Sequence, residues 1–463
     1  MRLRVTALLV AILGTALAVP AQAAEPTLRT LASARNIKIG TAVSEGPLKA
    51  EGAYRDKARY EFGSLTPENA MKWARVEPER GRFDWSAPDA IVDFAQANNM
   101  VVRGHTLVWH GSVPSWITGG SFTDDELRAL LKAHVETVMH RYAGKVGVWD
   151  VVNEAVAEDG TLRDSFWLRR LGPGYVADAF RWARAADPAA KLYINDFNAE
   201  WSNPKSDGLY ALVKSLKAEG VPIDGVGFQT HVTTNSGLTQ LGATLARFAA
   251  LGVDVAVTEL DVRMPLPADA AKLATQATLY QRATAACLAV ARCVSLTVWG
   301  FTDAHSWVPG TLDGWGAATL LDEDYQAKPA YTAVHAALAA RDFTTTVAGS
   351  GGCLAVPAVR AACDGSSGQR FTFRRTGAKL YSIVSARTGT CLSAASATVT
   401  QATCAAVPAQ TFELRAVSSQ DFQLRPTSTY KCLDGTAATV TVTACVSGLR
   451  GQVWRLASVP GHL

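Results

Sequence analysis

The sequence lacks the long hydrophobic runs and the excess of one charge that are typical of membrane proteins and nucleic-acid-binding proteins. Beyond the N-terminus, no segment has the roughly 18 uninterrupted apolar residues that a membrane-spanning helix needs. The 45 Lys and Arg residues nearly balance the 41 Asp and Glu residues, and no basic run stands out. We therefore expect no nucleic-acid partner and no membrane partner, and we expect the protein to bind a neutral small or polymeric molecule.

Cysteine is scarce over most of the chain. Six of the eight cysteines lie in the last quarter, and the other two, Cys287 and Cys293, form a close pair. Because no histidine accompanies the cysteines at ligand spacing, we expect no metal site, and no cofactor is expected either. The even number of cysteines predicts disulfide bonds, which are typical of exported proteins.

The N-terminus has the pattern of a secretory signal peptide. Arg2 and Arg4 precede an apolar stretch at 7–19, and Ala21-Gln22-Ala23 is typical of a cleavage site. We predict that residues 1–23 are a signal peptide and that the mature protein is secreted and extracellular. No membrane contact is expected after signal cleavage.

Between residues 36 and 340 the chain alternates β-branched apolar runs with helical patterns, which indicates βαβ units around a parallel sheet. A chain of 463 residues suits one large domain followed by a smaller one. Eight units over about 300 residues predict an α/β fold, a (β/α)8 TIM barrel over residues 30–341. The predicted strands are Ile37–Val43, Tyr60–Leu65, Val101–Val108, Val148–Val152, Lys191–Asn195, Gly225–Gln229, Asp254–Thr258 and Val294–Trp299.

Polar and aromatic side chains follow six of these strands, at the ends that form the active face of a TIM barrel. Glu154 follows the fourth strand and Glu259 follows the seventh. Two carboxyl groups in one cleft are what cleavage of a glycosidic bond needs, one as acid and one as nucleophile or base. A single glutamate at this place is also typical of a helix cap, but the polar groups at the other strand ends favour catalysis.

The C-terminal part has a different composition. Residues 342–350 are small and lack a helical period, which predicts a linker. Residues 351–457 are rich in Thr, Ser, Ala and Cys and contain a repeat of about 40 residues. Repeats this short cannot each bury a core, so we expect three of them to close around a common axis as a small all-β domain. The repeats are marked by Gln369-Arg370-Phe371, Gln410-Thr411-Phe412 and Gln452-Val453-Trp454.

Six motifs in the larger segment form a specific set. They are Thr66-Pro67-Glu68-Asn69-Ala70-Met71-Lys72-Trp73, Arg103-Gly104-His105-Thr106-Leu107-Val108-Trp109-His110, Trp149-Asp150-Val151-Val152-Asn153-Glu154-Ala155, Tyr193-Ile194-Asn195-Asp196, Gly227-Phe228-Gln229-Thr230-His231 and Thr258-Glu259-Leu260-Asp261. With them, residues 30 to 340 resemble the endo-β-1,4-xylanases of glycoside hydrolase family 10. The resemblance implies xylan and xylo-oligosaccharides as substrates, Glu154 as acid/base and Glu259 as nucleophile. It also implies a retaining reaction with the carboxyl groups about 5–5.5 Å apart.

The same resemblance implies roles for the residues around the glutamates. His231 is expected to hydrogen-bond Glu259 and to be held by Asp261, while Asn153 meets the sugar 2-hydroxyl and Gln229 completes that layer. The implied substrate-binding residues are Glu68, Asn69, Lys72, His105, Trp109, Trp299 and Trp307.

Two segments depart from the family's pattern. Gly111 and Ser112 stand where the family usually has a serine and a glutamine, and Val308 stands where it usually has an arginine. We expect these changes to alter substrate affinity or product pattern and to leave activity in place, because neither of them touches the glutamate pair.

The tail resembles a ricin-type β-trefoil of carbohydrate-binding module family 13, through its cysteine pairs and its Gln-x-Phe/Trp marks. The resemblance implies disulfides within the repeats. Together with the close pair in the larger domain, the expected bridges are Cys287–Cys293, Cys353–Cys363, Cys391–Cys404 and Cys432–Cys445.

The sugar-binding pattern of the trefoil is eroded. The family's aspartate is present only as Asp434, with Ala355 and Ser393 in the other repeats. The expected aromatic residues are replaced by Ala361, Ala402 and Thr443. The sequence therefore predicts the trefoil fold and leaves polysaccharide anchoring through Asp434 open.

Two other functions stay open at the level of sequence. A β-1,4-glucanase or mixed-specificity β-glycanase has the same glutamate pair, because the pair does not contact the substituent at the sugar C5; bulk from Trp299 and Trp307 favours xylose there. A non-catalytic carbohydrate-binding protein is disfavoured, since all the expected catalytic groups are present.

Overall fold

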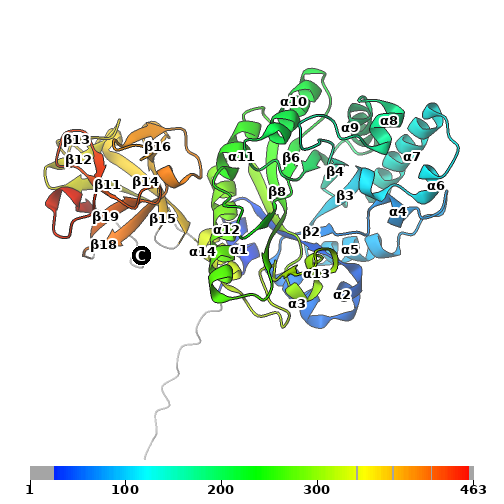
Figure 1. Cartoon of the computed structure of the whole chain (residues 1–463), viewed down its shortest axis with the longest axis horizontal. Helices are drawn as coiled ribbons and strands as arrows, with labels where there is room; N and C mark the ends of the chain where they lie inside the picture. Colours follow the sequence, from blue (N-terminus) through cyan, green and yellow to red (C-terminus); the bar gives the residue numbers. More distant parts are fainter. Residues whose placement is uncertain (1–24, 340–341, 378–379, 419, 458–463) are drawn as a thin grey trace, which may run out of the picture.

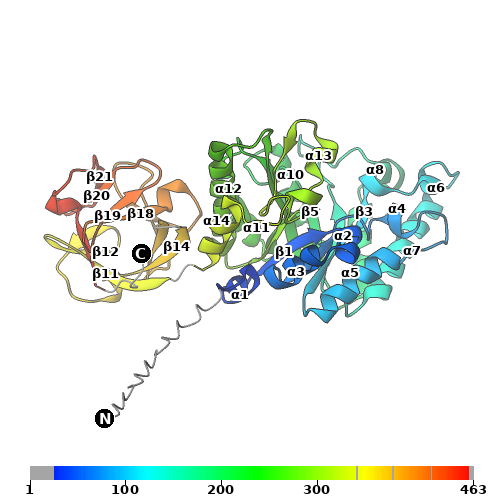
Figure 2. The same cartoon turned by 90° about the horizontal axis from the view of Figure 1, so that it is seen from below.

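The computed structural model describes residues 25–339, 342–377, 380–418 and 420–457. The predicted signal peptide, residues 1–23, lies outside the described residues. Figure 1 shows a larger α/β domain and a smaller all-β domain, which lies beside α12 and α14 of the larger one in both views (Figures 1 and 2). No helix in the described part of the chain is long and apolar enough to cross a membrane.

The larger domain is a closed barrel of parallel strands, as predicted. Within the described residues, the barrel strands pair in the order β8-β6-β5-β4-β3-β2-β1-β9, and pairing of β8 with β9 closes the ring. These strands are almost entirely buried, because each has a barrel interior on one face and helices on the other. They are β1 Lys38–Val43, β2 Ser64–Pro67, β3 Val101–Trp109, β4 Val148–Asn153, β5 Lys191–Asp196, β6 Gly225–Phe228, β8 Asp254–Pro265 and β9 Cys293–Val298.

Helices surround the barrel and cover the outer faces of its strands (Figure 1). Helix α7 begins with a capping box: the Glu126 N–H donates to Thr123 Oγ1, and the Thr123 N–H donates to Glu126 Oε2. The helices are α1 Leu28–Ser33, α2 Glu45–Ala50, α3 Gly52–Glu61, α4 Trp73–Val76, α5 Ser86–Ala97, α6 Ser115–Thr118, α7 Asp124–Tyr142, α8 Phe166–Leu171, α9 Tyr175–Ala186, α10 Pro204–Ala218, α11 Leu241–Ala249, α12 Ala270–Ala289, α13 Val308–Thr311 and α14 Pro329–Leu338.

Two of the predicted strands differ from the observed strands by more than one residue at an end. The second was predicted from Tyr60, but Tyr60 is 57% exposed in α3, whose buried residues Tyr54 and Ala58 are spaced by one helical turn. The seventh was predicted to end at Thr258, whereas β8 continues to Pro265. Beyond the barrel, β8 pairs with two short strands, β7 His231–Thr233 and β10 Trp315–Gly316. Glu259 lies where β8 still pairs with β9, and Asp261 lies on the extension, where it pairs with His231 of β7.

The smaller domain is all β, as predicted, and has its own buried core. Residues 342–350 were predicted as a linker, and this is wrong for most of them, because β11 pairs with β12, β14 and β22. Burial alternates along β11, where Thr345 and Val347 are buried and Thr344 is exposed, as in a strand with one face buried. The strands are β11 Phe343–Gly349, β12 Gly352–Ala355, β13 Val359–Ala361, β14 Arg370–Gly377, β15 Leu380–Ser385, β16 Cys391–Ser393, β17 Thr400–Ala402, β18 Phe412–Ala416, β19 Asp421–Pro426, β20 Cys432–Asp434, β21 Thr441–Thr443 and β22 Trp454–Leu456.

The repeated Gln-x-aromatic marks have one physical explanation in all three repeats. The buried glutamine side chains bond the backbone beside each repeat's second cysteine: Gln410 Oε1 accepts from the Ala405 N–H at 2.7 Å, and its Nε2 donates to the Thr403 carbonyl at 2.9 Å. Gln369 and Gln452 make the equivalent bonds. The aromatic residues of the marks are fully buried together in the core; they are Phe371, Phe412 and Trp454.

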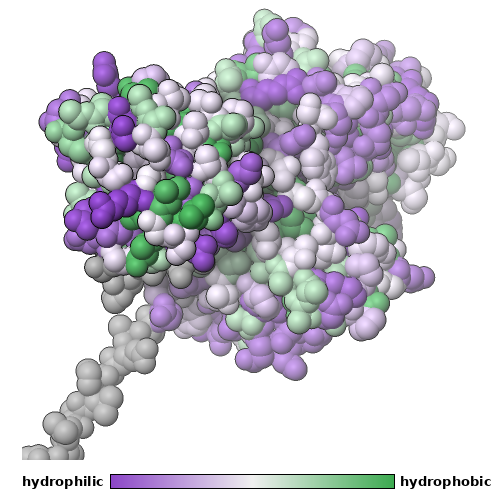
Figure 3. Space-filling view, turned by 60° about the vertical axis from the view of Figure 1, so that its left-hand side comes forward, coloured by the Kyte–Doolittle hydropathy of each residue, from purple (hydrophilic) through white to green (hydrophobic). Residues whose placement is uncertain are grey.

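Four disulfides join the predicted cysteine pairs, Cys287–Cys293, Cys353–Cys363, Cys391–Cys404 and Cys432–Cys445. Three of them each close one trefoil hairpin onto the loop that follows it. On the face shown in Figure 3, hydrophobic residues lie in small groups among hydrophilic ones. Tyr430 is 63% exposed and is the largest strongly exposed hydrophobic side chain among the described residues of the trefoil.

Candidate active site

A cleft of about 500 Å³ lies at the carboxyl ends of the barrel strands. This is the face on which TIM-barrel enzymes carry their active sites. The residues predicted from the sequence that line it are Lys72, His105, Trp109, Asn153, Glu154, Gln229, His231, Glu259, Trp299 and Trp307. Four further lining residues were not singled out by the sequence: Phe197, Asn198, Arg263 and Leu312.

Glu154 is the first residue after β4, and its backbone φ of +57° lies in the left-handed region. Such a conformation costs a non-glycine residue on the order of 1 kcal/mol and persists only where its surroundings hold it. Here the Glu154 N–H donates to the Asn195 carbonyl on β5 at 2.8 Å. Glu154 Oε2 accepts a hydrogen bond from Trp109 Nε1 at 2.9 Å, and Oε1 lies 3.3 Å from Gln229 Nε2. The closest donors to this carboxyl group are therefore neutral.

Glu259 is 4% exposed and has stronger partners. Its Oε1 accepts from Asn195 Nδ2 at 2.7 Å, and its Oε2 lies 3.1 Å from His231 Nε2. Burial opposes ionisation, but the hydrogen bond from His231 and the charges of His105 and His231 outweigh it and hold the pKa of Glu259 below its ordinary value. This glutamate is therefore ionised at neutral pH.

His231 is held between two carboxylates. Its Nδ1 lies 2.8 Å from Asp261 Oδ2, and that oxygen also accepts from Trp307 Nε1 at 2.7 Å. Burial lowers the pKa of His231, but the charge and hydrogen bond of Asp261, together with Glu259, raise the pKa to about 10. An imidazolium donates from both ring nitrogens, so His231 bonds both acids at once.

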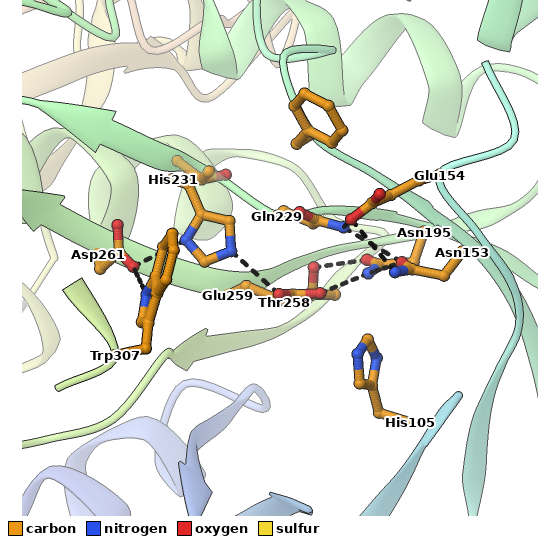
Figure 4. Close-up of polar contacts among 12 residues, drawn as sticks. His105, Asn153, Glu154, Asn195, Gln229, His231, Thr258, Glu259, Asp261 and Trp307 are labelled. Atoms are coloured by element: carbon orange, nitrogen blue, oxygen red, sulfur yellow. Dashed lines mark hydrogen bonds and ion pairs between the residues drawn. The ribbon is translucent and has the colours of Figure 1, made fainter. Parts of the chain in front are cut away.

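Three amide side chains lie between the two glutamates (Figure 4). Asn153 Oδ1 accepts from Asn195 Nδ2 at 2.9 Å and from Gln229 Nε2 at 3.2 Å. Asn195 is itself fixed by Thr258, whose Oγ1 donates to Asn195 Oδ1 at 2.7 Å. Asn195 belongs to one of the six sequence motifs, but no role was predicted for it. Its place at the carboxyl end of β5 was the available signal.

The His105 ring is oriented by the buried ion pair of Asp150 and Arg103. Its Nδ1 lies 3.0 Å from Asp150 Oδ2, and Asp150 also accepts hydrogen bonds from the Arg103 guanidinium. Although Asp150 is fully buried, Arg103 and His105 keep the pKa of its carboxyl group low. The His105 ring meets the Trp299 ring edge to face at 5.2 Å, which links the strand ends of β3 and β9.

Three of the predicted substrate-binding residues, Glu68, Asn69 and Lys72, follow β2. Lys72 Nζ donates to Asn69 Oδ1 at 2.8 Å and lies 4.8 Å from the centre of the Trp109 ring. Burial lowers the pKa of Lys72. The Glu68 carboxylate accepts a hydrogen bond from Oγ of Ser44, the residue after β1, at 2.7 Å. Glu68 and Asn69 do not line the main cleft.

The two departures from the family pattern have clear structural settings. Gly111 lies against the Trp109 indole, where an added Cβ would be 2.6 Å from Cζ2 of that ring. Val308 is completely buried at the start of α13. Arg263 lines the cleft, and its guanidinium carbon lies 5.9 Å from the centre of the Trp315 ring.

Asp434 of the trefoil is 9% exposed, and its carboxylate bonds its own hairpin. Oδ1 accepts from the N–H and the Oγ1 of Thr436, and Oδ2 accepts from Thr443 Oγ1 at 3.1 Å.

In the described ranges, no group of three or more His, Cys, Asp or Glu side chains is arranged to hold a metal ion.

A TIM barrel with two glutamates converging at its active face is the arrangement of barrel enzymes that cleave glycosidic bonds. Residues 27–337 match glycosyl hydrolase family 10, and residues 367–448 match the ricin-type beta-trefoil lectin domain-like family. This chain belongs to glycosyl hydrolase family 10, and its C-terminal domain is ricin B-lectin-like.

Similar proteins are named xylanases. Endo-1,4-beta-xylanase A of Fusarium oxysporum f. sp. lycopersici is 48% identical over 281 residues, which are 59% of this chain and 86% of that protein. Endo-1,4-beta-xylanase B of Thermotoga neapolitana is 43% identical over 311 residues, 66% of this chain and 90% of that protein.

Solved structures give the same result. Native xylanase 10B from Thermotoga maritima has 44% sequence identity and a TM-score of 0.65, covering 66% of this chain and 96% of its own. Xylanase 10B from Thermotoga petrophila RKU-1, solved in complex with xylobiose, has 43% sequence identity and a TM-score of 0.65. The match covers 69% of this chain and 97% of the solved chain.

Proposed function

We propose that this protein is a secreted, retaining endo-β-1,4-xylanase, which hydrolyses internal bonds of xylan by double displacement. The observation that carries the proposal is the unequal setting of two glutamates in one cleft. Glu259 is buried against an imidazolium, while Glu154 has a 16% exposed side chain among neutral donors. Membership of family 10 and relatives named xylanases support xylan and xylo-oligosaccharides as the substrate.

In the first step, the ionised Glu259 attacks the anomeric carbon while protonated Glu154 gives its proton to the leaving oxygen. The glycosidic bond breaks, and a covalent ester forms between the sugar and Glu259. Asn195 and His231 hold the two oxygens of the nucleophile in place. Asn153, whose Oδ1 already accepts from two amides, contacts the sugar 2-hydroxyl through its NH2 group.

In the second step, Glu154 has lost its proton and acts as a base. It removes a proton from water, the water oxygen attacks the anomeric carbon, and the ester bond to Glu259 breaks. Two inversions at the same carbon give net retention. The carboxyl separation expected for this route is about 5–5.5 Å.

The roles of the two glutamates are tested by replacing each with alanine and adding azide. Glu259→Ala abolishes xylan hydrolysis with an unchanged circular dichroism spectrum, and azide then gives an α-glycosyl azide from an activated aryl xylobioside. Glu154→Ala with azide gives the β-glycosyl azide, because Glu259 still forms the ester. Glu323→Ala, an exposed glutamate, serves as the control and keeps full activity. Substantial hydrolysis by Glu259→Ala would falsify the nucleophile assignment.

Preference for xylose is supported by indole rings around the cleft. Trp299 is 6% exposed, and Trp307 is fixed through Nε1 by Asp261. Bulk at these positions disfavours the hydroxymethyl group of glucose. Hydrolysis of aryl xylobioside is therefore expected to exceed that of aryl cellobioside; equal rates indicate a mixed-specificity β-glycanase.

Secretion is supported by the four disulfides, because such bonds persist in oxidising compartments. We assign catalysis to residues 30–341 and a polysaccharide-anchoring role to the trefoil, which starts at β11.

A further inference from the structure

The loop that follows Glu154 is held by Arg163, a residue to which the proposed reaction gives no role. Arg163 Nε donates to the Glu154 carbonyl at 2.9 Å, and its Nη2 donates to the Val156 carbonyl at 3.0 Å. The Arg163 N–H also donates to the Ala155 carbonyl at 2.8 Å. The planar guanidinium thus fixes the peptide groups next to Glu154, whose backbone is in the left-handed region.

A second cation anchors the same loop from behind. Lys205, in the first turn of α10, is completely buried, and its Nζ lies 3.0 Å from both Asp196 Oδ1 and Glu158 Oε1. Asp196 is also fully buried, and its Oδ2 accepts from the Val156 N–H at 3.0 Å. The Lys205–Asp196 pair therefore joins α10, the end of β5 and the loop.

Close backbone packing brings these parts together. Gly160 in the loop and Gly208 in α10 face one another, and a Cβ on either would clash with the other segment's backbone. Gly160 also has a φ of +87°, which favours glycine. The loop consequently lies directly on the helix that carries Lys205.

Phe197 connects the two cations to the cleft. Lys205 Nζ lies 3.3 Å from the centre of the Phe197 ring, and Arg163 Cζ lies 5.4 Å from it. Phe197 and Glu154 both line the cleft. The cations therefore support the two cleft-lining side chains of this region without lining the cleft themselves.

We propose that Arg163, supported by the buried Lys205–Asp196 pair, is a positioning residue for Glu154, which orients its carboxyl group toward the leaving oxygen. This inference rests on the proposed acid/base role of Glu154. Arg163 transfers no proton; it acts through the Glu154 backbone.

The test uses the leaving-group dependence of glycosylation in the full-length protein. A poor leaving group such as phenol needs protonation by Glu154, whereas 2,4-dinitrophenolate leaves without it. For Arg163→Met, kcat/KM is expected to fall about 10- to 100-fold on phenyl xylobioside and less than about threefold on 2,4-dinitrophenyl xylobioside. Each variant is measured at its own pH optimum, so that a changed pKa is not mistaken for displacement.

Two further variants separate the charge of Arg163 from its hydrogen-bonding geometry. Arg163→Lys keeps the charge but cannot bond both carbonyls in the same way, so only partial recovery is expected. The pair Lys205→Met with Asp196→Asn removes both buried charges and keeps an acceptor for the Val156 N–H; a smaller loss with the same selectivity is expected. Arg169→Met is the matched control with unchanged kinetics, because Arg169 pairs with exposed Asp164.

Equal losses on both substrates, no loss on either, or full recovery in Arg163→Lys overturns the positioning role. Glu154→Ala is measured in the same series. If Glu154→Ala is not selective for poor leaving groups, the proposed function fails; if it is selective and Arg163→Met is not, only this inference fails.

Discussion

Glu154 and Glu259 have the same side chain and opposite surroundings. Glu259 faces an imidazolium and an amide, while Glu154 faces an indole and amides. A positive charge lies next to Glu259, whereas the closest donors to Glu154 are neutral. Such a difference moves the pKa values of two carboxyl groups apart, so that one can serve as acid and the other as nucleophile.

The pH dependence of activity tests the part of His231. The proposed role of Glu259 as nucleophile needs its ionised form, so activity is expected to be lost as pH falls through the pKa of Glu259, which His231 holds low. His231→Gln removes that positive charge and leaves burial opposed mainly by His105, so the pKa of Glu259 rises. The acid limb of kcat/KM against pH is therefore expected to move to higher pH.

The control for this experiment is His140→Gln, an exposed histidine on α7, which leaves the acid limb in place. An unchanged acid limb in His231→Gln would show that the imidazolium does not set the ionisation of the nucleophile.

At the residue level, strand-end position pointed to most of the residues that line the cleft, while the roles expected for them came from the family resemblance. Asn195 shows the limit of that reasoning. A polar residue at a strand end is identifiable in the sequence, but the bonds from one amide group to both Asn153 and Glu259 depend on the distance between β4, β5 and β8. Arg163 shows the same limit, since its partners are backbone carbonyls.

At the scale of elements, α7 packs a neutral histidine into the barrel's outer layer. His134 is 2% exposed and stacks on Trp73 with ring centres 3.9 Å apart. Burial lowers the pKa of His134 to about 3. The helix position alone could not predict this, because neighbouring segments supply the stacking ring.

This histidine makes stability depend on pH. In the unfolded chain His134 takes up a proton as pH falls below about 6.5, while in the folded protein it stays neutral until about pH 3. Its contribution to stability is therefore present above pH 6.5 and is lost as pH falls. By pH 4.5 the loss is about 2–3 kcal/mol.

His134→Phe keeps the stacked ring and removes the titration. The difference between the free energies of unfolding at pH 7 and pH 4.5, measured in urea, is expected to shrink by about that amount. The exposed His140→Gln should leave the difference unchanged. An equal pH dependence in wild type and His134→Phe would contradict the assignment.

The strand prediction succeeded where apolar runs are continuous and failed at boundaries. Tyr60 is β-prone by residue type, yet it belongs to α3 because Tyr54 and Ala58 bury one face of a helix. The residues predicted as a linker form β11 because the trefoil supplies three partner strands.

At the scale of the whole molecule, the two domains have separate hydrophobic cores and different sources of stability. The barrel has a large core and one short-range disulfide. The trefoil has a small core and three disulfides with sequence separations of 10, 13 and 13. In the loop-closure account each of these three contributes about 3 kcal/mol.

Reduction should therefore affect the trefoil first. With dithiothreitol, calorimetry is expected to show a lowered transition for the trefoil, while activity on soluble xylo-oligosaccharides at moderate temperature persists. Simultaneous loss of activity and of both transitions would mean that the barrel depends on the trefoil or on Cys287–Cys293.

Truncation tests the role of the trefoil. Removal of residues 342–463 leaves every barrel strand in place, so turnover of soluble xylan is expected to stay within about twofold. Retention on insoluble xylan is expected to fall, as measured by pull-down. If retention is unchanged, the trefoil is not a working binding module.

Asp434 belongs to the same question. Because its carboxylate bonds Thr436 and Thr443, Asp434→Asn separates a structural part from a sugar contact. Reduced retention with an unchanged melting temperature supports the sugar contact, and the reverse pattern supports a structural part only.

The sequence by itself determined the barrel, the threefold all-β tail and the glutamate pair, because period, spacing and residue type are local properties of the chain. The trefoil assignment and the disulfide pairs within the repeats followed from the family resemblance. Only the tertiary structure decided which groups touch those glutamates. The ionised state of Glu259, the amide bridge through Asn195 and the hold of Arg163 on Glu154 depend on distances between strands and loops far apart in sequence. Hydrogen bonds and charge effects change over tenths of an ångström, and such distances are set only when the barrel closes.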